Sequence, residues 1–361
     1  MRLSASGLAI LLGCGPATPI AAPPPPVTSA SSPAPDTPPP APEPLPAASA
    51  APSAAPAAPP PAPEPPFPPA AFRPPVERTA QPGDGTWTPL VAGAAGEPAL
   101  MYRSTVHPDA IKRQVYVAVV AIDLRRVGVH LVAGTHEPIA KSVPDERRPG
   151  LVPAADQPAL LAVFNGGFMT RHGQWGMMVD GDVFLPARED GCTVALFRDG
   201  SVGIGAHPAI APKLADAVAF RQTPPCLVER GAIEPALLGS EKPRRWGMSE
   251  SGGVDIRRSA LGLADGGRTL IYGLGEGITP RQMAEAMRAA GAVDAAQLDV
   301  NWSYTRFLLY GKPASPGAPP EVTSTLIPKI KHGARQYVVK PADRDFFYLT
   351  AKSQPSKSSD R

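Results

Sequence analysis

The feature that most limits how this chain can fold is a long proline-rich stretch near its N-terminus. Of the 50 prolines, 27 lie in residues 1–82, and residues 15–75 consist almost wholly of Pro, Ala, Ser and Thr. Such a segment cannot bury enough apolar surface to offset the entropy of ordering it, and proline holds it extended. We therefore predict a disordered linker over residues 15–84 that acts as a spacer, with recognition of the proline runs as the alternative.

Residues 1–14 have the pattern of a lipoprotein signal peptide. Arg2 supplies a positive charge, and residues 3–13 form an apolar run that is shorter than the ~20 residues needed to span a bilayer. The run ends in Leu11-Leu12-Gly13-Cys14, which resembles the bacterial lipobox. We predict that Cys14 carries lipid and anchors the protein at the bacterial cell envelope, in the outer membrane or periplasm. An ordinary signal peptide with a chance cysteine is the alternative.

The remaining sequence predicts one substantial domain over residues 85–349, or two small ones, and a polar, disordered tail over residues 350–361. The net charge is +3 with both signs mixed, and no basic stripe of the nucleic-acid-binding kind occurs. No second apolar run approaches 18 residues. The sequence thus predicts no nucleic-acid partner and leaves the oligomeric state open.

Two cysteines, Cys192 and Cys226, remain if Cys14 is acylated. An oxidising envelope permits a disulfide between them, and closing this loop would contribute about 3–4 kcal/mol. Two buried free thiols are the alternative. His172, His207 and His332 are isolated in the sequence and no Cys/His spacing resembles a zinc site, so we predict neither a metal nor a cofactor.

Short apolar and β-branched runs separated by turn residues predict hairpins. Asp180-Gly181, Asp199-Gly200 and Asp265-Gly266-Gly267 each lie between two such runs. Arg125-Arg126 separates the runs 114–124 and 127–133, which suggests a further hairpin.

One helix is well specified. Thr279 and Gln282 form a capping box around Pro280, an apolar stripe follows, and Gly291 ends the helix. A strand over residues 295–298 then leads into Asp299. The whole pattern predicts an α+β fold of mixed, mostly antiparallel sheets built from hairpins, with a few packing helices.

Five blocks of the sequence resemble, in the same order, those of the phosphodiester glycosidase domain family. The blocks are VYVAVVAIDL, ALLAVFNGGFM, GMMVDGDVF, RRSALGLADGGRTLIYG and GITPRQMAEAMRAAGAVDAAQLDV, and they lie within residues 115–309. The resemblance implies the fold of this family and its activity, the removal of N-acetylglucosamine from a phosphodiester. It also implies a carbohydrate or glycosyl phosphodiester as the partner.

One motif departs from the family pattern, in which Leu-Asp is followed by three glycines and then serines. Here Leu298-Asp299 is followed by Val300, Asn301 and Trp302. Glycine lets the backbone approach a ligand closely and adopt positive φ, which valine and tryptophan cannot readily do. The fold is therefore expected to carry over better than the activity.

Three residues are candidates for catalysis. Asp299 follows a buried strand, where a carboxyl group is costly unless it is functional or caps the chain. Arg258 matches the arginine of the family strand and could grip a phosphodiester, or it could pair with a carboxylate. Glu276 could complete a two-carboxylate glycosidase pair with Asp299.

The candidate substrate-binding residues fall into two groups. Asn165, Gly166 and Gly167 break a strand and could bind a sugar hydroxyl or form a plain turn. Aromatic and polar side chains near the altered motif could stack on sugar rings or pack in the core: Trp175, Asn301, Trp302, Ser303, Tyr304, Thr305 and Arg306.

Two classes of function follow from these residues. The first, which we favour, is an envelope-anchored hydrolase that cleaves a glycosyl phosphodiester or a related glycoconjugate. The second is a non-catalytic glycan- or envelope-binding lipoprotein that kept the fold and lost the chemistry.

Overall fold

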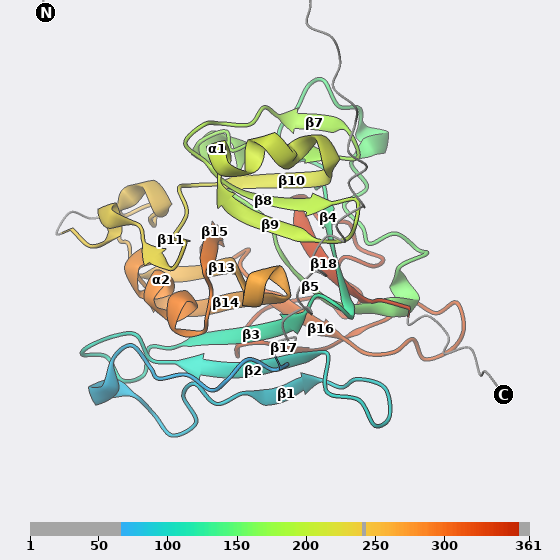
Figure 1. The fold of residues 1–361 in the computed structure, drawn as a ribbon. Coiled ribbons are helices and arrows are strands. Elements are labelled where there is room, and N and C mark those ends of the chain that lie inside the picture. The colour runs from blue at the N-terminus through green and yellow to red at the C-terminus, as the bar shows by residue number, and fades with distance from the viewer. Residues whose placement is uncertain (1–65, 240–242, 354–361) are drawn as a thin grey trace, which may run out of the picture. The chain divides into compact units, whose positions relative to one another are not determined.

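The computed structural model describes residues 66–239 and 243–353 (Figure 1). The predictions for Cys14, the signal peptide, the linker before residue 66 and the tail after residue 353 lie outside the described residues. The described chain forms three sheets with a few short helices, and its named strand pairs are all antiparallel. This arrangement confirms the predicted α+β class.

The largest sheet has eight strands in the order β1-β2-β3-β14-β13-β15-β11-β12. Its strands are β1 (Thr88–Val91), β2 (Met101–Val106), β3 (Val117–Asp123), β14 (Thr269–Ile278), β13 (Ile256–Ala264), β15 (Asp294–Val300), β11 (Val228–Glu229) and β12 (Ala232–Ile233). The two central strands, β13 and β14, are also the longest, and they bring β3 and β15 to either side of one buried hairpin.

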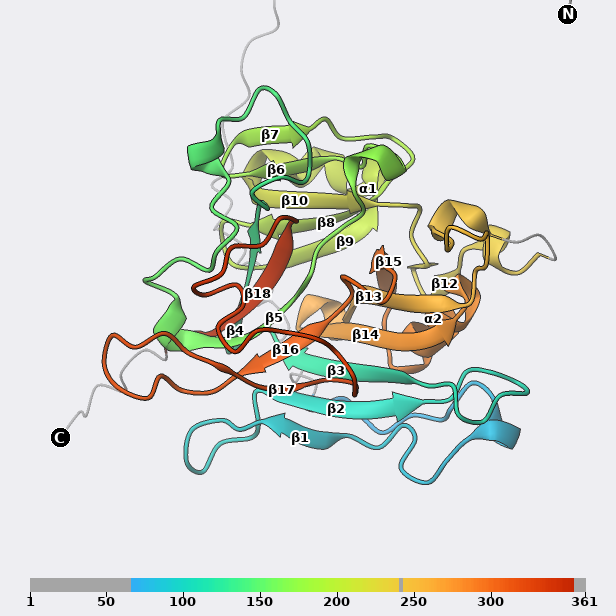
Figure 2. The same cartoon turned by 180° about the vertical axis from the view of Figure 1, so that it is seen from behind.

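Two five-stranded sheets complete the domain. The second sheet has the order β7 (Asp182–Leu185), β6 (Met177–Val179), β10 (Ala217–Thr223), β8 (Cys192–Phe197) and β9 (Val202–Ala206). The third has the order β17 (Val322–Thr325), β16 (Phe307–Tyr310), β5 (Leu160–Asn165), β18 (Phe346–Ala351) and β4 (Val127–Val132). Figure 2 shows that the last strand of the chain, β18, lies beside β4 and β5.

The helices in the described residues are short. The α-helices are α1 (His207–Ile210) and α2 (Pro280–Ala289). The 3₁₀ turns are η1 (Glu77–Thr79), η2 (Asp145–Arg147), η3 (Gln157–Ala159), η4 (Thr170–His172), η5 (Ala211–Asp216), η6 (Pro235–Leu237), η7 (Arg244–Trp246) and η8 (Asp265–Gly267). No helix among the residues described is long and apolar enough to cross a membrane.

Helix α2 follows its sequence signals. Both hydrogen bonds of the capping box between Thr279 and Gln282 are present, and Gly291 has a φ of 100° just after the helix. Met283 and Met287 are fully buried in an apolar cluster between α2 and the eight-stranded sheet. The predicted helix is therefore confirmed, and its apolar stripe is what holds it on the sheet.

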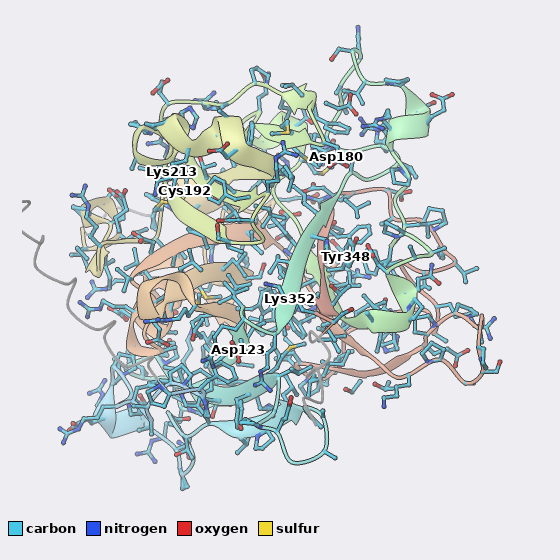
Figure 3. All side chains as sticks on the ribbon, turned by 45° about the vertical axis from the view of Figure 1, so that its right-hand side comes forward. Asp123, Asp180, Cys192, Lys213, Tyr348 and Lys352 are labelled. Atoms are coloured by element: carbon cyan, nitrogen blue, oxygen red, sulfur yellow. A yellow bond between two sulfur atoms is a disulfide. The ribbon has the colours of Figure 1, made fainter. Side chains whose placement is uncertain are left out.

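The hairpins predicted at Asp180-Gly181, Asp199-Gly200 and residues 265–267 are confirmed as β6–β7, β8–β9 and β13–β14. The hairpin predicted across Arg125-Arg126 is wrong, because β3 and β4 belong to different sheets. Asp123 accepts hydrogen bonds from both arginines at the sheet change, and Lys352 donates to the main-chain oxygen of Leu124 there (Figure 3). The turn between β3 and β4 is therefore stabilised by the ion pairs of Asp123 with Arg125 and Arg126, and not by pairing of the two strands.

Two further features bear on the predicted boundaries. The part of the predicted linker that is described, residues 66–84, contains Phe67 and Phe72, which pack against the cluster under α2. Cys192 and Cys226 form a disulfide with a Cα–Cα distance of 4.8 Å. This bond joins the start of β8 to the segment that leads into β11.

Candidate functional site

The candidate site lies where the ends of three strands meet. The main-chain nitrogen of Asp299, near the end of β15, donates to the oxygen of Gly166, just after β5, at 3.0 Å. The main-chain nitrogen of Gly166 in turn donates to the oxygen of Asp345, just before β18, at 3.0 Å. The site is therefore built by chain segments that come together only in the folded domain.

A cleft of about 1190 Å³ opens at this junction. Five arginines and four carboxylates are among the residues that line it: Arg171, Arg244, Arg245, Arg257, Arg344, Glu250, Asp255, Glu276 and Asp299. His172, Met248, Asn301, Trp302 and Ser303 also face it. Its arginines make it suited to an anionic ligand.

Asp299 is the buried carboxyl group of this cleft, with 3% of its surface exposed. Its Oδ2 accepts a hydrogen bond from Nη2 of Arg344, and its Oδ1 accepts one from the main-chain nitrogen of Val300 at 2.8 Å. Burial raises the pKa of Asp299 to about 6, against the opposing effect of Arg344. Such a group can exchange a proton near neutral pH.

Arg344 is the partner that the sequence analysis missed. Its guanidinium lies 3.9 Å from the centroid of the Tyr304 ring and also donates to the oxygen of Gly167 at 3.3 Å. Its Nε is buried and has no hydrogen-bond partner in the part of the chain that is described. Burial disfavours its charged form, but Asp299, Tyr304, Asp345 and Glu137 together outweigh burial and raise the pKa of Arg344.

Glu276 lies at the rim of the cleft, where 58% of its side chain is exposed. It accepts hydrogen bonds from Nε and Nη2 of Arg257 at 2.8 and 2.5 Å, and Arg257 also donates to the oxygen of Trp302. The structure thus brings Glu276 and Asp299 to one cleft, each with its own arginine. The carboxyl group of Glu276 is largely exposed to solvent, whereas that of Asp299 is buried.

Arg258 does not line the cleft, in contrast to the role predicted for it. Its five N–H groups donate to the main-chain oxygens of four residues and to the side chain of Gln297; those four residues are Trp246, Gly247, Val254 and Ile278. Burial lowers its pKa to about 9. All the N–H groups of Arg258 are used within the protein, three of them on the main chain of the loop 246–254. No N–H group of Arg258 remains to bind a phosphodiester.

Asn165 and the two glycines after it also face the protein. Asn165 is fully buried; it donates to Ser259 at 2.9 Å and accepts from the hydroxyl of Tyr272 at 3.1 Å. A Cβ atom on Gly166 would lie 2.1 Å from Oδ2 of Asp345, and one on Gly167 would lie 2.6 Å from Cζ of Arg221. These glycines let segments of the protein approach each other, rather than a ligand approach the backbone.

The altered motif divides into buried and exposed residues. Val300 packs with Phe168 and Trp175 in a small apolar cluster, so Trp175 follows the core-packing alternative. Asn301 has a φ of 81°, the left-handed conformation that glycine adopts most easily. Trp302 is 67% exposed on the cleft rim, next to Ser303.

The last three predicted residues stabilise the loop itself. The hydroxyl of Tyr304 donates to the main-chain oxygen of Asp345, and that of Thr305 donates to the oxygen of Asp299 at 3.4 Å. Arg306 folds back to donate to the oxygens of Ser303 and Tyr304. None of these three side chains is among those that line the cleft.

Apart from Arg257, the arginines of the cleft come from segments that no motif marked. Arg344 and Asp345 form a charged pair directly before the apolar run of β18, and this pair is the one sequence signal for Arg344. Arg171, Arg244 and Arg245 lie in or beside short 3₁₀ turns. Within the described ranges, no three His, Cys, Asp or Glu side chains are placed to hold a metal ion.

Comparisons with known proteins give one family match. Residues 159–312 match the family model described as phosphodiester glycosidase. No curated protein sequence matches the chain.

Two solved structures are among those that the chain matches. One is the catalytic domain of zebrafish N-acetylglucosamine-1-phosphodiester alpha-N-acetylglucosaminidase, auto-inhibited by its pro-peptide, with 16% identity and a TM-score of 0.44 over 74% of this chain and 88% of that one. The other is a hypothetical protein from Synechocystis, with 13% identity and a TM-score of 0.38 over 70% of this chain and 62% of that one. Through residues 159–312, the chain is thus similar to the phosphodiester glycosidase family, as the order of its sequence blocks predicts.

Proposed function

We propose that this domain hydrolyses a glycosyl phosphodiester, or a related glycoconjugate of the cell envelope, with Asp299 as the general base. The observation that carries the proposal is the burial of this carboxyl group in a cleft lined by arginines. The family match over residues 159–312 supports the same class of reaction.

The chemistry of the substrate favours a base over an acid. When the bond between the sugar and the phosphate breaks, the leaving group is a phosphate monoester, which is stable as an anion and needs little help from a proton donor. The attacking water, in contrast, must lose a proton. Asp299 takes this proton, water supplies the new hydroxyl at the sugar, and the arginines stabilise the departing phosphate.

Arginines without a carboxylate partner are available for the phosphate. Arg257, Arg344 and Arg245 pair with Glu276, Asp299 and Asp190, respectively. Arg171 and Arg244 line the cleft and have no carboxylate partner in the described part of the chain. They are the candidates for binding the anionic group of the substrate.

The test compares the wild type with Asp299→Asn on a panel of sugar phosphodiesters. Loss of a general base lowers rates by about 10²–10⁴-fold, so we expect kcat to fall by at least about 100-fold with little change in KM. The wild-type rate should rise with pH through about 6. Asp182→Asn, which removes a carboxylate paired with Arg147 outside the cleft, serves as control. Equal activity of the wild type and Asp299→Asn would remove Asp299 from the mechanism.

The exposure of Trp302 on the rim favours a second candidate function, binding of a glycan without cleavage. An exposed indole can stack on a sugar ring and contributes little to folding. A positive glycan array together with no sugar release from the whole substrate panel would favour this alternative. Trp302→Ala should then weaken glycan binding and leave the melting temperature unchanged.

We also propose that the protein is a lipoprotein anchored through Cys14 at the cell envelope. The lipobox-like sequence Leu11-Leu12-Gly13-Cys14 supports the proposal. Labelling with a fatty acid should mark the wild type and leave Cys14→Ser unmarked. Labelling of both proteins alike would refute it.

A further inference from the structure

Two neighbouring residues at the start of β18 extend into different parts of the domain. Arg344 points into the cleft and binds the carboxylate of Asp299. Asp345 is buried and binds Arg221, on the second sheet, through an Nε–Oδ2 contact of 2.9 Å. Because they share one peptide bond, the position of one side chain constrains the other.

Arg221 is held rigidly on the far side of Asp345. It is fully buried and donates to the main-chain oxygens of Trp175, Gln222 and Phe168 at 2.7, 3.1 and 2.5 Å. A buried arginine with this many partners cannot change its position without breaking several hydrogen bonds. It therefore acts as a fixed point for the chain at residue 345.

Asp345 also joins the three strand ends of the site. Its Oδ2 accepts the main-chain nitrogen of Gly167 at 2.8 Å, and its main-chain oxygen accepts that of Gly166 at 3.0 Å. The oxygen of Gly166 accepts the nitrogen of Asp299. The same residue thus holds the backbone that carries Asp299 and the backbone that carries Arg344.

We infer that Arg344 is a positioning residue that holds the carboxyl group of Asp299 for proton transfer, and that the buried Arg221–Asp345 ion pair keeps Arg344 in place. The inference rests on the proposed function for the role of Asp299. The contacts among these four side chains come from β10, β15 and the start of β18.

The charged and titratable groups around Asp299 determine the direction of the expected effect. These groups are Arg344 and Arg221, which favour its ionised form, and Asp345, which opposes it. Asp299 in turn helps to raise the pKa of Tyr304. Loss of Arg344 leaves the carboxyl group buried without its nearest cation. The titration of Asp299 should then move to higher pH by about one unit or more, because an adjacent arginine lowers a carboxyl pKa by about 1–3 units.

The experiment measures two quantities in the wild type, Arg344→Gln, Arg344→Lys and Arg221→Lys. The first is the titration midpoint of Asp299, followed by carboxyl NMR on aspartate-labelled protein and assigned with Asp299→Asn. The second is the pH profile of sugar release from a sugar phosphodiester. Arg335→Gln, which removes an exposed arginine paired with Glu321, is the matched control.

Arg344→Gln should raise the midpoint of Asp299 and shift the rising limb of the pH profile by the same amount. Arg344→Lys, which keeps the positive charge, should bring the midpoint most of the way back to the wild-type value. A merely structural role of Arg344 would not predict this recovery. Arg221→Lys, which keeps the charge but loses the guanidinium contacts with Asp345, should raise the midpoint in the same direction. Asp345→Asn is not used, because it also removes a negative charge that itself raises the pKa of Asp299. Arg335→Gln should leave both quantities unchanged.

The two proposals fail in different ways. If the wild type releases no sugar but Arg344→Gln still moves the NMR midpoint, the proposed function fails and the positioning of Asp299 stands. If the wild type releases sugar and Arg344→Gln changes neither the midpoint nor the pH profile, the positioning role is refuted.

Discussion

The guanidinium of Arg258 donates from Nη1 to the side-chain oxygen of Gln297 at 3.1 Å, beneath the floor of the cleft. The same nitrogen donates to the oxygen of Trp246, which also accepts from the amide of Gln297. Two buried side chains, Arg258 and Gln297, therefore donate hydrogen bonds to the main-chain oxygen of Trp246, in the loop that leads into the cleft. This explains why a strand in the centre of the sheet contains an arginine.

Replacement of Arg258 should destabilise the fold rather than weaken substrate binding. Arg258→Met leaves buried main-chain oxygens without donors, each at a cost of about 1–3 kcal/mol. We expect the free energy of unfolding in urea to fall by about 3 kcal/mol or more. Arg335→Met should change it by less than about 0.5 kcal/mol. Normal stability combined with a large rise in KM would instead place Arg258 in substrate binding.

The disulfide between Cys192 and Cys226 should contribute measurably to stability. The two residues are 34 positions apart, and closing a loop of this length in the unfolded chain is worth about 3–4 kcal/mol. The double variant Cys192→Ala/Cys226→Ala should therefore unfold at a lower urea concentration. A reducing agent should lower the stability of the wild type and have no effect on the variant. Equal midpoints for the oxidised and reduced wild type would contradict this prediction.

Asp299 should make stability depend on pH in a defined direction. Its pKa is about 6 in the folded protein against an ordinary value of 3.8, so the folded state holds more protons than the unfolded state between these values. Its contribution to stability is therefore complete below pH 3.8 and is lost as the pH rises through about 6.

Asp299→Asn removes this titration. The unfolding free energy of the variant, relative to the wild type, should rise by about 3 kcal/mol between pH 3.5 and pH 7. Asp182→Asn, a half-buried control outside the cleft, should show a much smaller trend. A constant difference between Asp299→Asn and the wild type across this range would argue against a raised pKa.

Asn301 offers a test of the altered motif. Its φ of 81° is in the left-handed region, which costs most side chains about 1–2 kcal/mol and costs glycine almost nothing. We expect Asn301→Gly to keep or slightly raise the melting temperature, and Asn301→Val to lower the free energy of unfolding by at least about 1 kcal/mol. Equal stability of the two variants would show that this conformation is not required.

The motif also shows where a sequence expectation needed refinement. Val300, Asn301 and Trp302 stand where the family pattern has glycines, and the sequence predicted that valine and tryptophan cannot readily adopt positive φ. Asn301 is the residue of the three with positive φ, because asparagine tolerates this conformation better than other non-glycine residues. Val300 is buried instead, and Trp302 is left exposed, which no local pattern could distinguish.

Side-chain direction was the main reason that the candidate site could be predicted only in part. Arg257 and Arg258 are adjacent in β13, and neighbouring residues of a strand point to opposite faces. Arg257 faces the cleft, while Arg258 lies beneath it. The sequence identified the strand, but which face becomes the cleft depends on what packs against each side.

The sequence by itself determined the elements whose signals are local: the three hairpins at Asp-Gly turns, the capped helix α2 and the polar residue at the end of β15. Turn and cap chemistry acts between residues a few positions apart, so it can be read directly from the chain. Only the tertiary structure decided that Arg344 completes the site. Its contact with Asp299 spans 45 residues and that of Arg221 with Asp345 spans 124, and these distances are closed by sheet pairing and core packing.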